Sequence, residues 1–486
     1  MPQQPSKPMP TGRIARVAPL VGLAGRTAGE AVVASLGRRI RGIDADANDA
    51  NGSPRLSLRQ DMAQRYVEQL GHSKGVLMKV GQILSLTSLG SSVTGDGEPF
   101  LQRALSRLHD DAPPMSAELA MAALREELGD RVAEFASFDA EPVAAASIGQ
   151  VHFATLLDGT EVAVKIQYPG VAEAMRVDLK NTELIATFLQ LMRGALPDYN
   201  KIDPRAIAAE LAVRIDEEID YELEAATQME FAQSYQGHPF IRIPEVFTAL
   251  STRRVLTMER GNGRRYAQVM TDGPPATAAQ QQLRDQWGEA IWRFSLGSMR
   301  RLGLFHADPH PGNFLFNDDG SVTVLDFGCV KRFTPEQIRV VRNLLQATLD
   351  GDGQGAVLGF AQMGVFDLAD PPDPEAVLRW HRQSLSAMLE PQPFRFTPEY
   401  AASAVQAEMS SFGPHRDIVR NASIDPEYML LTRIQLGLNT VLAGLYASGN
   451  WRAIRDEWDC NAEAASPLGE QDLAFWAEKP TWVTLP

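Results

Sequence analysis

The amino-acid sequence predicts an α+β protein, and three of its features lead to that fold class. Two strand-like runs, "VHFATLL" and "EVAVKIQ", flank a turn at Asp158-Gly159, and apolar residues alternate along the second run. Short apolar runs between residues 304 and 328 flank another turn, at Asp319-Gly320. Most of the chain from about residue 278 onward, outside that segment, has apolar residues at helical spacing.

The composition is that of a globular protein with a large core. The 486 residues suffice for two or three packed units, and 44% of them are apolar and 22% charged. The two cysteines, Cys329 and Cys460, are too few for a disulfide framework, so a reducing compartment is expected. No apolar run reaches the roughly 18–20 residues that cross a bilayer, and the polar start "MPQQPSKPMP" does not read as a secretory signal.

The charge is distributed unevenly along the chain. The net charge of −15 argues against nucleic acid as a partner. Residues 1–43 nevertheless carry a net charge of +6, which leaves −21 for the remainder. Two interpretations of this basic segment are a helix that lies on anionic lipid and a helix that packs on the main body. We therefore expect a cytoplasmic protein that could be peripheral at a membrane, or a mitochondrial one if the segment is a transit peptide.

Each further element is justified by a local pattern. Residues 58–89 show helical spacing, and two more helices are expected within residues 96–135, separated by "DDAPP". After the strand pair come helices at about 170–194 and 204–234, the second beginning with Asp203 as N-cap and Pro204. "RRVLTMER" reads as a strand, and the late helix "RIQLGLNTVLAGLYASGNW" is interpreted as core because glycines break its apolar run.

The most specific chemical signal is "LFHADPHPGNFLFNDDGSVTVLDFGCV". In it Asn313 follows Asp308 by five positions, and Asp326 stands first in Asp-Phe-Gly. Asp308 can orient or deprotonate an attacking hydroxyl or water, while Asn313 and Asp326 offer hard oxygen ligands for Mg²⁺. With the upstream "VAVK", this spacing indicates phosphoryl transfer from a nucleotide.

Lys165 ends the "VAVK" run and is the candidate contact for the α- and β-phosphates. A buried lysine needs a carboxylate partner, and "DEEIDYELEA" offers Glu218, Asp220 and Glu224. The alternative for this acidic stretch is a solvated helix face. The residues alone leave the partner undecided.

Together these motifs resemble the UbiB-type, or AarF-type, atypical protein-kinase-like family, which includes the coenzyme Q biosynthesis ATPases. The resemblance covers roughly residues 60–345. It is carried by "KVGQ", "AAASIGQVH", "EIDYELEA" and "HADPHPGNFL…DFG".

The resemblance implies a two-lobed protein-kinase-like fold that binds ATP or ADP with Mg²⁺. The expected parts are a basic segment 1–56, a helical extension 57–135, an N-lobe 136–262 with inserted helices, and a C-lobe with a helical C-terminal region, 263–486. In the family, the lysine and glutamine of the KxGQ motif, here Lys79 and Gln82, fold over the nucleotide pocket. Lys79 would pair with Glu218 of the ExD motif, which also includes Asp220, and Lys165 would pair with Glu224.

One turn departs from ordinary protein kinases. Where a glycine-rich turn would cover the phosphates, this chain has Ala144, Ala145, Ala146 and Ser147. Because a Cβ atom restricts positive φ, we expect a restricted cradle that changes nucleotide preference and suppresses protein phosphorylation.

Three functions remain in view. The first is a UbiB-type ATPase or kinase that supports isoprenoid-quinone or related lipid metabolism, with quinone precursors, lipid and a membrane surface as candidate partners and a homodimer as a candidate assembly. The second is a small-molecule phosphotransferase like the aminoglycoside kinases, which leaves "KVGQ" and "AAASIGQVH" unexplained. The third is a nucleotide-gated pseudokinase scaffold, which the complete set of Lys165, Asp308, Asn313 and Asp326 disfavours.

Overall fold

The structure is a computed structural model that describes residues 115–146, 148–179, 212–213, 215–409, 415, 417–418, 422 and 426–479. The chain divides into two compact units, Met1–Met115 with Tyr168–Leu196, and Ser116–Gln167 with Pro197–Pro486. In the first unit the described helix is α6 (Val171–Leu179). The predictions about residues 1–56, Lys79, Gln82 and Ser147, and most of the expected extension 57–135, lie outside the described residues. All elements below belong to the second unit.

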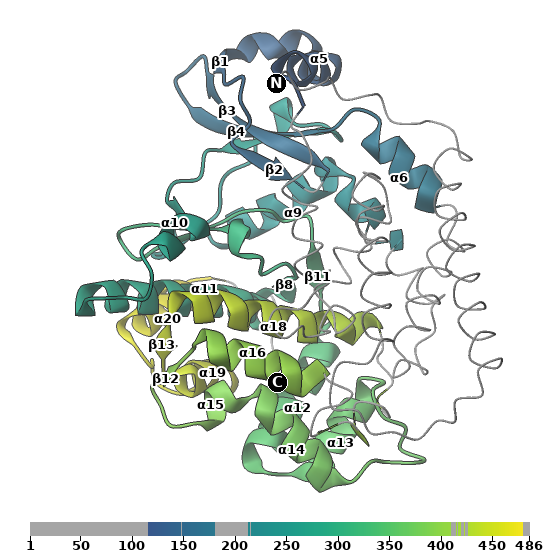
Figure 1. The fold of residues 1–486 in the computed structure, drawn as a ribbon, viewed down its shortest axis with the longest axis vertical. Helices are drawn as coiled ribbons and strands as arrows, with labels where there is room; N and C mark the ends of the chain where they lie inside the picture. The colour runs from purple at the N-terminus through teal and green to yellow at the C-terminus, as the bar shows by residue number, and fades with distance from the viewer. Residues whose placement is uncertain are drawn as a thin grey trace, which may run out of the picture. The chain divides into compact units, whose positions relative to one another are not determined.

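A sheet of antiparallel strands forms the first part of the second unit (Figure 1). Its strands are β1 (Phe135–Phe138), β2 (Ala144–Ala146), β3 (Gly149–Leu156), β4 (Glu161–Gln167) and β6 (Val255–Glu259), in the order β1-β3-β4-β6 with β2 paired to β3. Along β4, Val162, Val164 and Ile166 are fully buried. Because side chains alternate along a strand, Lys165 lies on the opposite face from these three residues.

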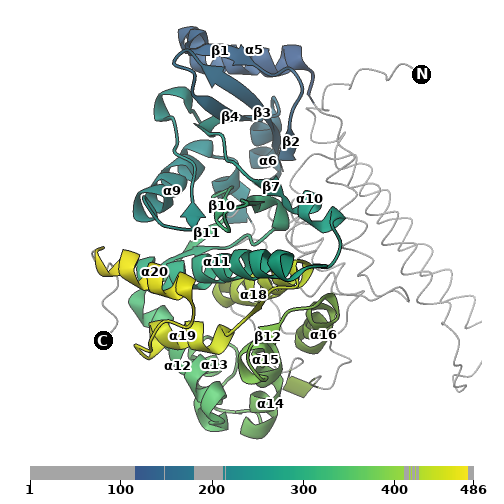
Figure 2. The same ribbon diagram turned by 90° about the vertical axis from the view of Figure 1, so that its left-hand side faces the viewer.

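Three short elements cover or border this sheet. Helix α5 (Ala117–Leu128) contacts β4, and Ser116 caps its first turn by accepting a hydrogen bond from Leu119 N. The helix continues into the 3₁₀ helix η2 (Gly129–Glu134), and a second 3₁₀ helix, η4 (Thr248–Leu250), precedes β6. Figure 2 shows α5 above the sheet at the end of the molecule away from the helical lobe.

The prediction of one continuous helix over 204–234 is wrong. Helical residues 212–213 and 215–218 end in a turn at Ile219, and a new helix, α9 (Tyr221–Ser234), begins after Asp220. The Asp220 side chain accepts from Glu222 N, and Gln167 Nε2 donates to Ile219 O at 3.0 Å. These bonds satisfy main-chain groups that the helix break leaves without a helical partner. One of the two side chains involved, Gln167, lies on β4 and is therefore distant in sequence.

A second sheet and a short strand pair carry the metal-ligand motif. The sheet has the order β5 (Ile241–Arg242), β10 (Val322–Val324), β9 (Phe314–Phe316) and β7 (Arg264–Arg265), and only the β5–β10 pair is parallel. β9 and β10 form the predicted hairpin around Asp319-Gly320, where Gly320 has φ +84°. β8 (Leu304–His306) pairs with β11 (Val330–Arg332), so both ends of the motif are fixed by strand pairing.

Helices make up most of the remaining described part of the second unit. They are α10 (Tyr266–Thr271), α11 (Ala278–Leu302), α12 (Pro335–Asp350), α13 (Gly353–Gln362), α14 (Pro374–Ser384), α15 (Ser386–Leu389), α16 (Pro398–Met409), α18 (Pro426–Leu445), α19 (Trp451–Asp459) and α20 (Pro467–Ala477). The short elements among them are the 3₁₀ helix η5 (Pro311–Asn313) and the strand pair β12 (Phe394–Arg395) with β13 (Ser448–Gly449).

Helix α11 is the central helix of this lobe. It begins at a capping box of Thr277 and Gln280 and ends at Gly303, which has φ +67°. Its Trp287 and Trp292 belong to the same buried cluster as Leu438 of α18. The prediction that residues 433–451 form a core helix is therefore confirmed for α18, whose Leu438, Val441 and Leu442 are fully buried.

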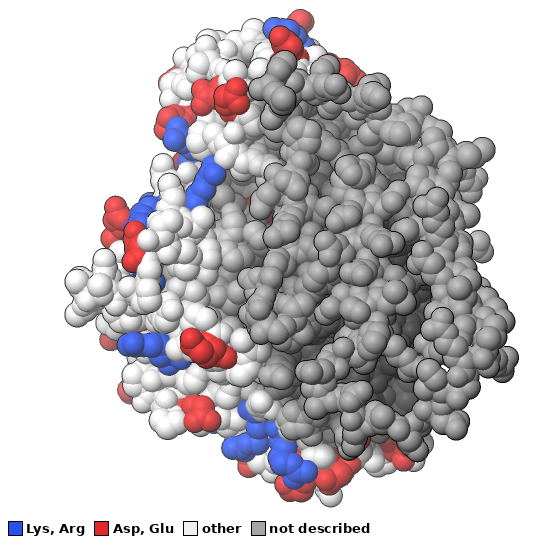
Figure 3. All heavy atoms as spheres, in the orientation of Figure 1, with Lys and Arg blue, Asp and Glu red and all other residues white. Residues whose placement is uncertain are grey.

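The described surface carries charge of both signs. On the face shown in Figure 3, lysines and arginines lie interspersed with aspartates and glutamates along the described residues. Within the described part of the chain, no helix combines the length and the apolar character required to span a membrane.

Candidate active site

Lys165 of β4 is buried and lies between two carboxylates. Its Nζ donates to Glu224 Oε1 at 2.8 Å and Oε2 at 2.9 Å, and to Asp326 Oδ2 at 3.3 Å. The Lys165 and Glu224 side chains are 9% and 2% exposed, whereas that of Asp326 is 40% exposed. The Lys165–Glu224 pair that the resemblance implied is thus present. Asp326 is a third side chain at the same ammonium, on its solvent side.

Burial and charge act in opposite directions on this pair. Burial alone would lower the pKa of Lys165, but the carboxylates of Asp326 and Glu224 outweigh it and hold that pKa well above its usual value. Burial raises the pKa of Glu224, and Lys165 opposes that rise. Lys165 therefore remains a cation at neutral pH, as a phosphate contact requires.

The ring of Tyr221 lies against the ammonium of Lys165, and Tyr221 was not identified as a site residue from the sequence. The Lys165 Nζ lies 4.9 Å from the centroid of the Tyr221 ring, within the range of a cation–π contact. Burial raises the pKa of Tyr221, so its hydroxyl stays neutral. The signal was available, because Tyr221 precedes Glu224 by three positions and therefore shares its helix face.

Asp308 and Asn313 are held together by η5 and the loop before it. Asn313 Nδ2 donates to the main-chain oxygen and to Oδ2 of Asp308, at 3.0 Å each. At the other side of Asn313, Leu325 N donates to its main-chain oxygen at 2.8 Å. Because Asp326 directly follows Leu325, this last bond brings Asn313 close to Asp326. The three motif residues Asp308, Asn313 and Asp326 therefore lie together.

Asp326 has an unusual backbone conformation for a residue other than glycine, with φ +59°. His306 Nε2 donates to the Asp326 main-chain oxygen at 2.7 Å, and Gly328 N donates to Asp326 Oδ1 at 3.1 Å. Phe327 is buried, and its ring lies 5.1 Å from that of Phe231 on α9. Surrounding contacts thus hold a conformation that costs free energy, which is typical of functional sites.

The donor set fits Mg²⁺ bound to a nucleotide. Asp326 offers carboxylate oxygens, and Asn313 keeps its side-chain oxygen because its Nδ2 makes both bonds to Asp308. Among the described residues, no group of three or more His, Cys, Asp and Glu side chains could hold a metal ion. Mg²⁺ at nucleotide sites is commonly held by one or two protein oxygen ligands together with phosphate oxygens.

The alanine motif forms a strand, which corrects its interpretation as a turn. Ala144, Ala145 and Ala146 make up β2 and pair with Val151, Gln150 and Gly149. Ile148, between β2 and β3, is in a turn. A Cβ atom on Gly149 would stand 2.2 Å from Ile166 O, so glycine is required there for β3 to approach β4.

The remaining acids of "DEEIDYELEA" have other surroundings. Asp220 caps α9, and its Oδ2 accepts from Arg253 Nη2 at 2.7 Å. Glu218 lies at the end of the helical segment before the break. Its implied partner, Lys79, lies outside the described residues, so the Lys79–Glu218 pair stays a prediction.

A cavity lies away from this site. It has a volume of about 540 Å³ and is formed by α14, α15, β12 and α16, with Ser386, Arg395 and Tyr400 among its walls. Its lining does not include Lys165, Asp308, Asn313 or Asp326.

Comparison with known proteins agrees with this geometry. The family model described as "ABC1 atypical kinase-like domain" matches residues 107–358. The chain is 35% identical over 348 residues to the protein named "Atypical kinase COQ8B, mitochondrial" from Rattus norvegicus, which covers 71% of this chain and 61% of that protein. It is also 35% identical over 272 residues to "Protein ACTIVITY OF BC1 COMPLEX KINASE 8, chloroplastic" from Arabidopsis thaliana, covering 54% of this chain and 34% of that protein.

A solved structure shares the fold. The complex of Rv3197 with erythromycin, from Mycobacterium tuberculosis, matches with a TM-score of 0.58 and 29% identity, covering 83% of this chain and 97% of that one. The two curated relatives above are longer than the matched region, since the chain spans 61% and 34% of their lengths.

Proposed function

Because this chain belongs to the ABC1 atypical kinase-like, or UbiB, family, we propose that it is an ATP- and Mg²⁺-dependent enzyme that transfers or hydrolyses the terminal phosphoryl group in support of isoprenoid-quinone or related lipid metabolism. The observation that carries this proposal is the convergence of Lys165, Glu224 and Asp326, together with Asp308 and Asn313, which are hydrogen-bonded to each other and joined by a main-chain bond to the residue before Asp326. A scaffold without catalysis has no need of all five.

The sheet face around Lys165 also suits a nucleotide. Val151 and Leu256 pair directly with Lys165, and Ala163 pairs with Met258. Directly paired residues share a face of the sheet, and so do residues two apart along a strand. The face that carries Lys165 therefore continues into an apolar surface of the kind that accommodates an adenine ring.

The chain's own groups have distinct roles in this proposal. When bound, the metal and nucleotide supply the phosphoryl group and neutralise its charge. Lys165 contacts the α- and β-phosphate oxygens, and Glu224 holds its ammonium in place. Asn313 and Asp326 ligate the metal. Asp308 orients the attacking hydroxyl or water and accepts its proton.

The experiment for the reaction measures ADP release by the purified chain, with and without anionic vesicles and phenolic quinone-precursor analogues. We expect Mg²⁺-dependent release that rises when vesicles or phenols are present. The absence of any Mg²⁺-dependent release under all of these conditions would contradict the proposal. Loss of an isoprenoid quinone on deletion of the gene tests the metabolic role separately.

The proposed membrane contact rests on the basic residues 1–43. Binding to anionic vesicles should weaken as salt is raised, because screening acts within about 10 Å at 0.1 M ionic strength. The matched control is the same protein without residues 1–43. Equal vesicle binding by the two proteins would remove this part of the proposal.

A further inference from the structure

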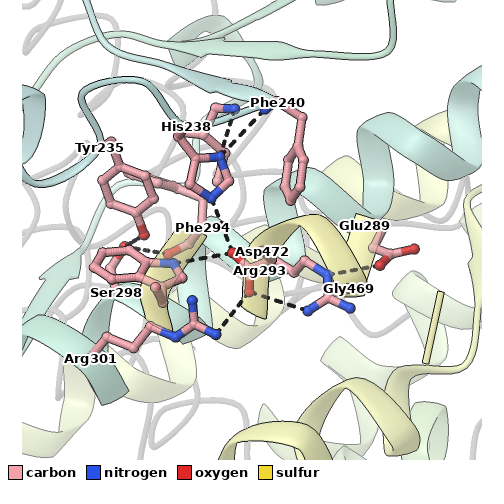
Figure 4. A network of polar contacts seen from close by, with 12 residues as sticks. Tyr235, His238, Phe240, Glu289, Arg293, Phe294, Ser298, Arg301, Gly469 and Asp472 are labelled. Carbon is pink, nitrogen blue, oxygen red and sulfur yellow. Dashed lines mark hydrogen bonds and ion pairs between the residues drawn. The ribbon is translucent and has the colours of Figure 1, made fainter. Parts of the chain in front are cut away.

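Helix α20, near the C-terminus, is bonded to the chain that leaves α9, the helix that carries Glu224 (Figure 4). We propose that Asp472 and Trp476 of α20 are positioning residues that hold α9 in the place where Glu224 meets Lys165. This inference rests on the proposed function for its kinetic consequences, and its structural part can be tested without them.

Asp472 is the centre of the contact. It is buried, and its carboxylate accepts three hydrogen bonds and forms an ion pair with a further arginine. Oδ1 accepts from His238 Nε2 at 3.1 Å and from Trp476 Nε1 at 3.2 Å. Oδ2 accepts a hydrogen bond from Arg293 Nη1 at 3.4 Å and forms an ion pair with Arg301 Nη2 at 2.9 Å. One side chain of α20 thereby joins α11 to the segment after α9.

The bond from His238 has a fixed direction. His238 Nδ1 accepts from Ile241 N at 3.2 Å and from Phe240 N at 3.4 Å, so the ring proton is on Nε2 and points to Asp472. The His238 side chain is fully buried. Neither the ring nor the carboxylate can leave this arrangement without losing a buried partner.

Tyr235 makes the second contact between α9 and α20. It directly follows α9, and its ring packs edge-on against that of Trp476, with the two ring centroids 5.3 Å apart. Its hydroxyl shares a 2.7 Å hydrogen bond with Ser298 of α11. His238 N also donates to Tyr235 O, so the aromatic contact of Tyr235 and the hydrogen bond from His238 to Asp472 act on one short segment.

Helix α9 transmits this restraint because it is continuous from Tyr221 to Ser234. Glu224 and Ser234 are ten residues apart, which is about 15 Å along a helix. The other end is held by the Asp220–Arg253 pair. Between the ends, Leu223 and Met229 are 47% and 43% exposed, while Gln228 and Phe231 are fully buried, so α9 packs along one face and the contacts at its two ends add to that restraint.

The chain offers a matched control in Asp459 of α19. Asp459 is equally buried and accepts from Arg300 Nε at 3.0 Å and from Arg455 Nε at 2.8 Å. It joins α19 to α11, because its hydrogen-bond partners Arg300 and Arg455 lie on α11 and α19 and not on α9 or in the segment after it. Asp459→Asn and Asp472→Asn therefore remove comparable buried charges, and only the second acts on α9.

The test compares the two variants by hydrogen exchange of residues 221–234 and by nucleotide kinetics on the full chain. Both should lower the melting temperature. Asp472→Asn alone should speed exchange in α9, by roughly fivefold or more, and lower kcat/KM by a similar factor. Trp476→Leu, at a partly exposed position, should give the same pattern more weakly if Asp472→Asn does not fold.

Combination with Glu224→Gln separates positioning from general destabilisation. If Asp472 acts through Glu224, Asp472→Asn should lower nucleotide affinity in the native background and add no further loss in Glu224→Gln. Equal exchange in α9 for the Asp472 and Asp459 variants overturns the inference. A wild-type chain without Mg²⁺-dependent turnover contradicts the proposed function instead, and the exchange comparison still decides whether α20 holds α9.

Discussion

Lys165 is a buried cation whose charge is balanced by two carboxylates of unequal exposure. Glu224 is enclosed with it, and Asp326 lies at the solvent side of the same ammonium. Desolvating a lysine and a glutamate is expensive, so each of the two depends on the other. The pair therefore fixes the position of the Lys165 ammonium, which the proposed reaction uses to contact phosphate, rather than supplying a large net stabilisation of the fold.

Replacing Glu224 by methionine should destabilise the protein by about 3–5 kcal/mol, because Lys165 loses its enclosed partner. Chemical denaturation of Glu224→Met measures this loss. The double variant Lys165→Met/Glu224→Met should recover most of the free energy of unfolding, since two apolar side chains need no counter-charge. Neither protein should turn over nucleotide. A double variant that is less stable than Glu224→Met would contradict this account of the pair.

Some of these residues could be located from the sequence and others could not. Asp308, Asn313 and Asp326 were predictable because their spacing is set by a local loop and hairpin. Glu224 was one of three acids until the resemblance was considered, because helix spacing alone does not say which face meets Lys165. Asp472 gave no signal, since its partners are separated from it by up to 234 positions.

The β2–β3 hairpin is the element that most distinguishes this site from a glycine-rich one. Ala145 is exposed and pairs with Gln150, while Gly149 lies against the backbone of Ile166. The rigidity of the hairpin therefore comes from strand pairing on both sides of β3. The alanines contribute by limiting the backbone freedom of β2.

Ala145→Gly should raise autophosphorylation and change the relative affinities for ATP and ADP, because glycine widens the conformations open to β2. Incorporation of labelled phosphate into the protein measures the first effect, and equilibrium nucleotide binding measures the second. Ala249→Gly, at an exposed position in η4, is the matched control. Unaltered affinities together with no autophosphorylation would count against a restraining role for the alanines.

Strands were easier to predict than helix ends. The alternation in "EVAVKIQ" located β4 at its observed bounds because one face of that strand is buried. The break at Ile219 and Asp220 was missed because it depends on Gln167 and Arg253, which are distant in sequence. Local propensity favours one long helix, and these tertiary hydrogen bonds override it.

At the scale of the whole molecule, the helical lobe contains buried polar groups that respond to pH. Burial lowers the pKa of His238, and its bond to Asp472 only partly offsets this. Below about pH 6.5, the usual pKa of histidine, His238 binds a proton in the unfolded chain but not in the folded chain. The free energy of unfolding should then fall as the solution is acidified, by up to about 1.4 kcal/mol per pH unit from this group.

The variant that checks this is His238→Gln, whose amide can accept from the main chain and donate to Asp472 but does not titrate. Denaturation between pH 5 and 7 should show a shallower pH dependence for His238→Gln than for the native chain. Other buried histidines, such as His381 with a pKa lowered to about 4, act in the same direction in both proteins. Asp472 titrates below this window, because its cationic neighbours lower its pKa. Equal slopes would contradict a neutral, buried His238.

The central claim is that Asp326, in its strained backbone position, binds the metal for phosphoryl transfer. The most direct test measures Mg²⁺-dependent ADP release by Asp326→Asn, beside Asp318→Asn as a control at an exposed position in the neighbouring hairpin. The account predicts that Asp326→Asn loses this activity and retains a cooperative thermal transition, while Asp318→Asn behaves like the native chain. Undiminished Mg²⁺-dependent release from Asp326→Asn would contradict it.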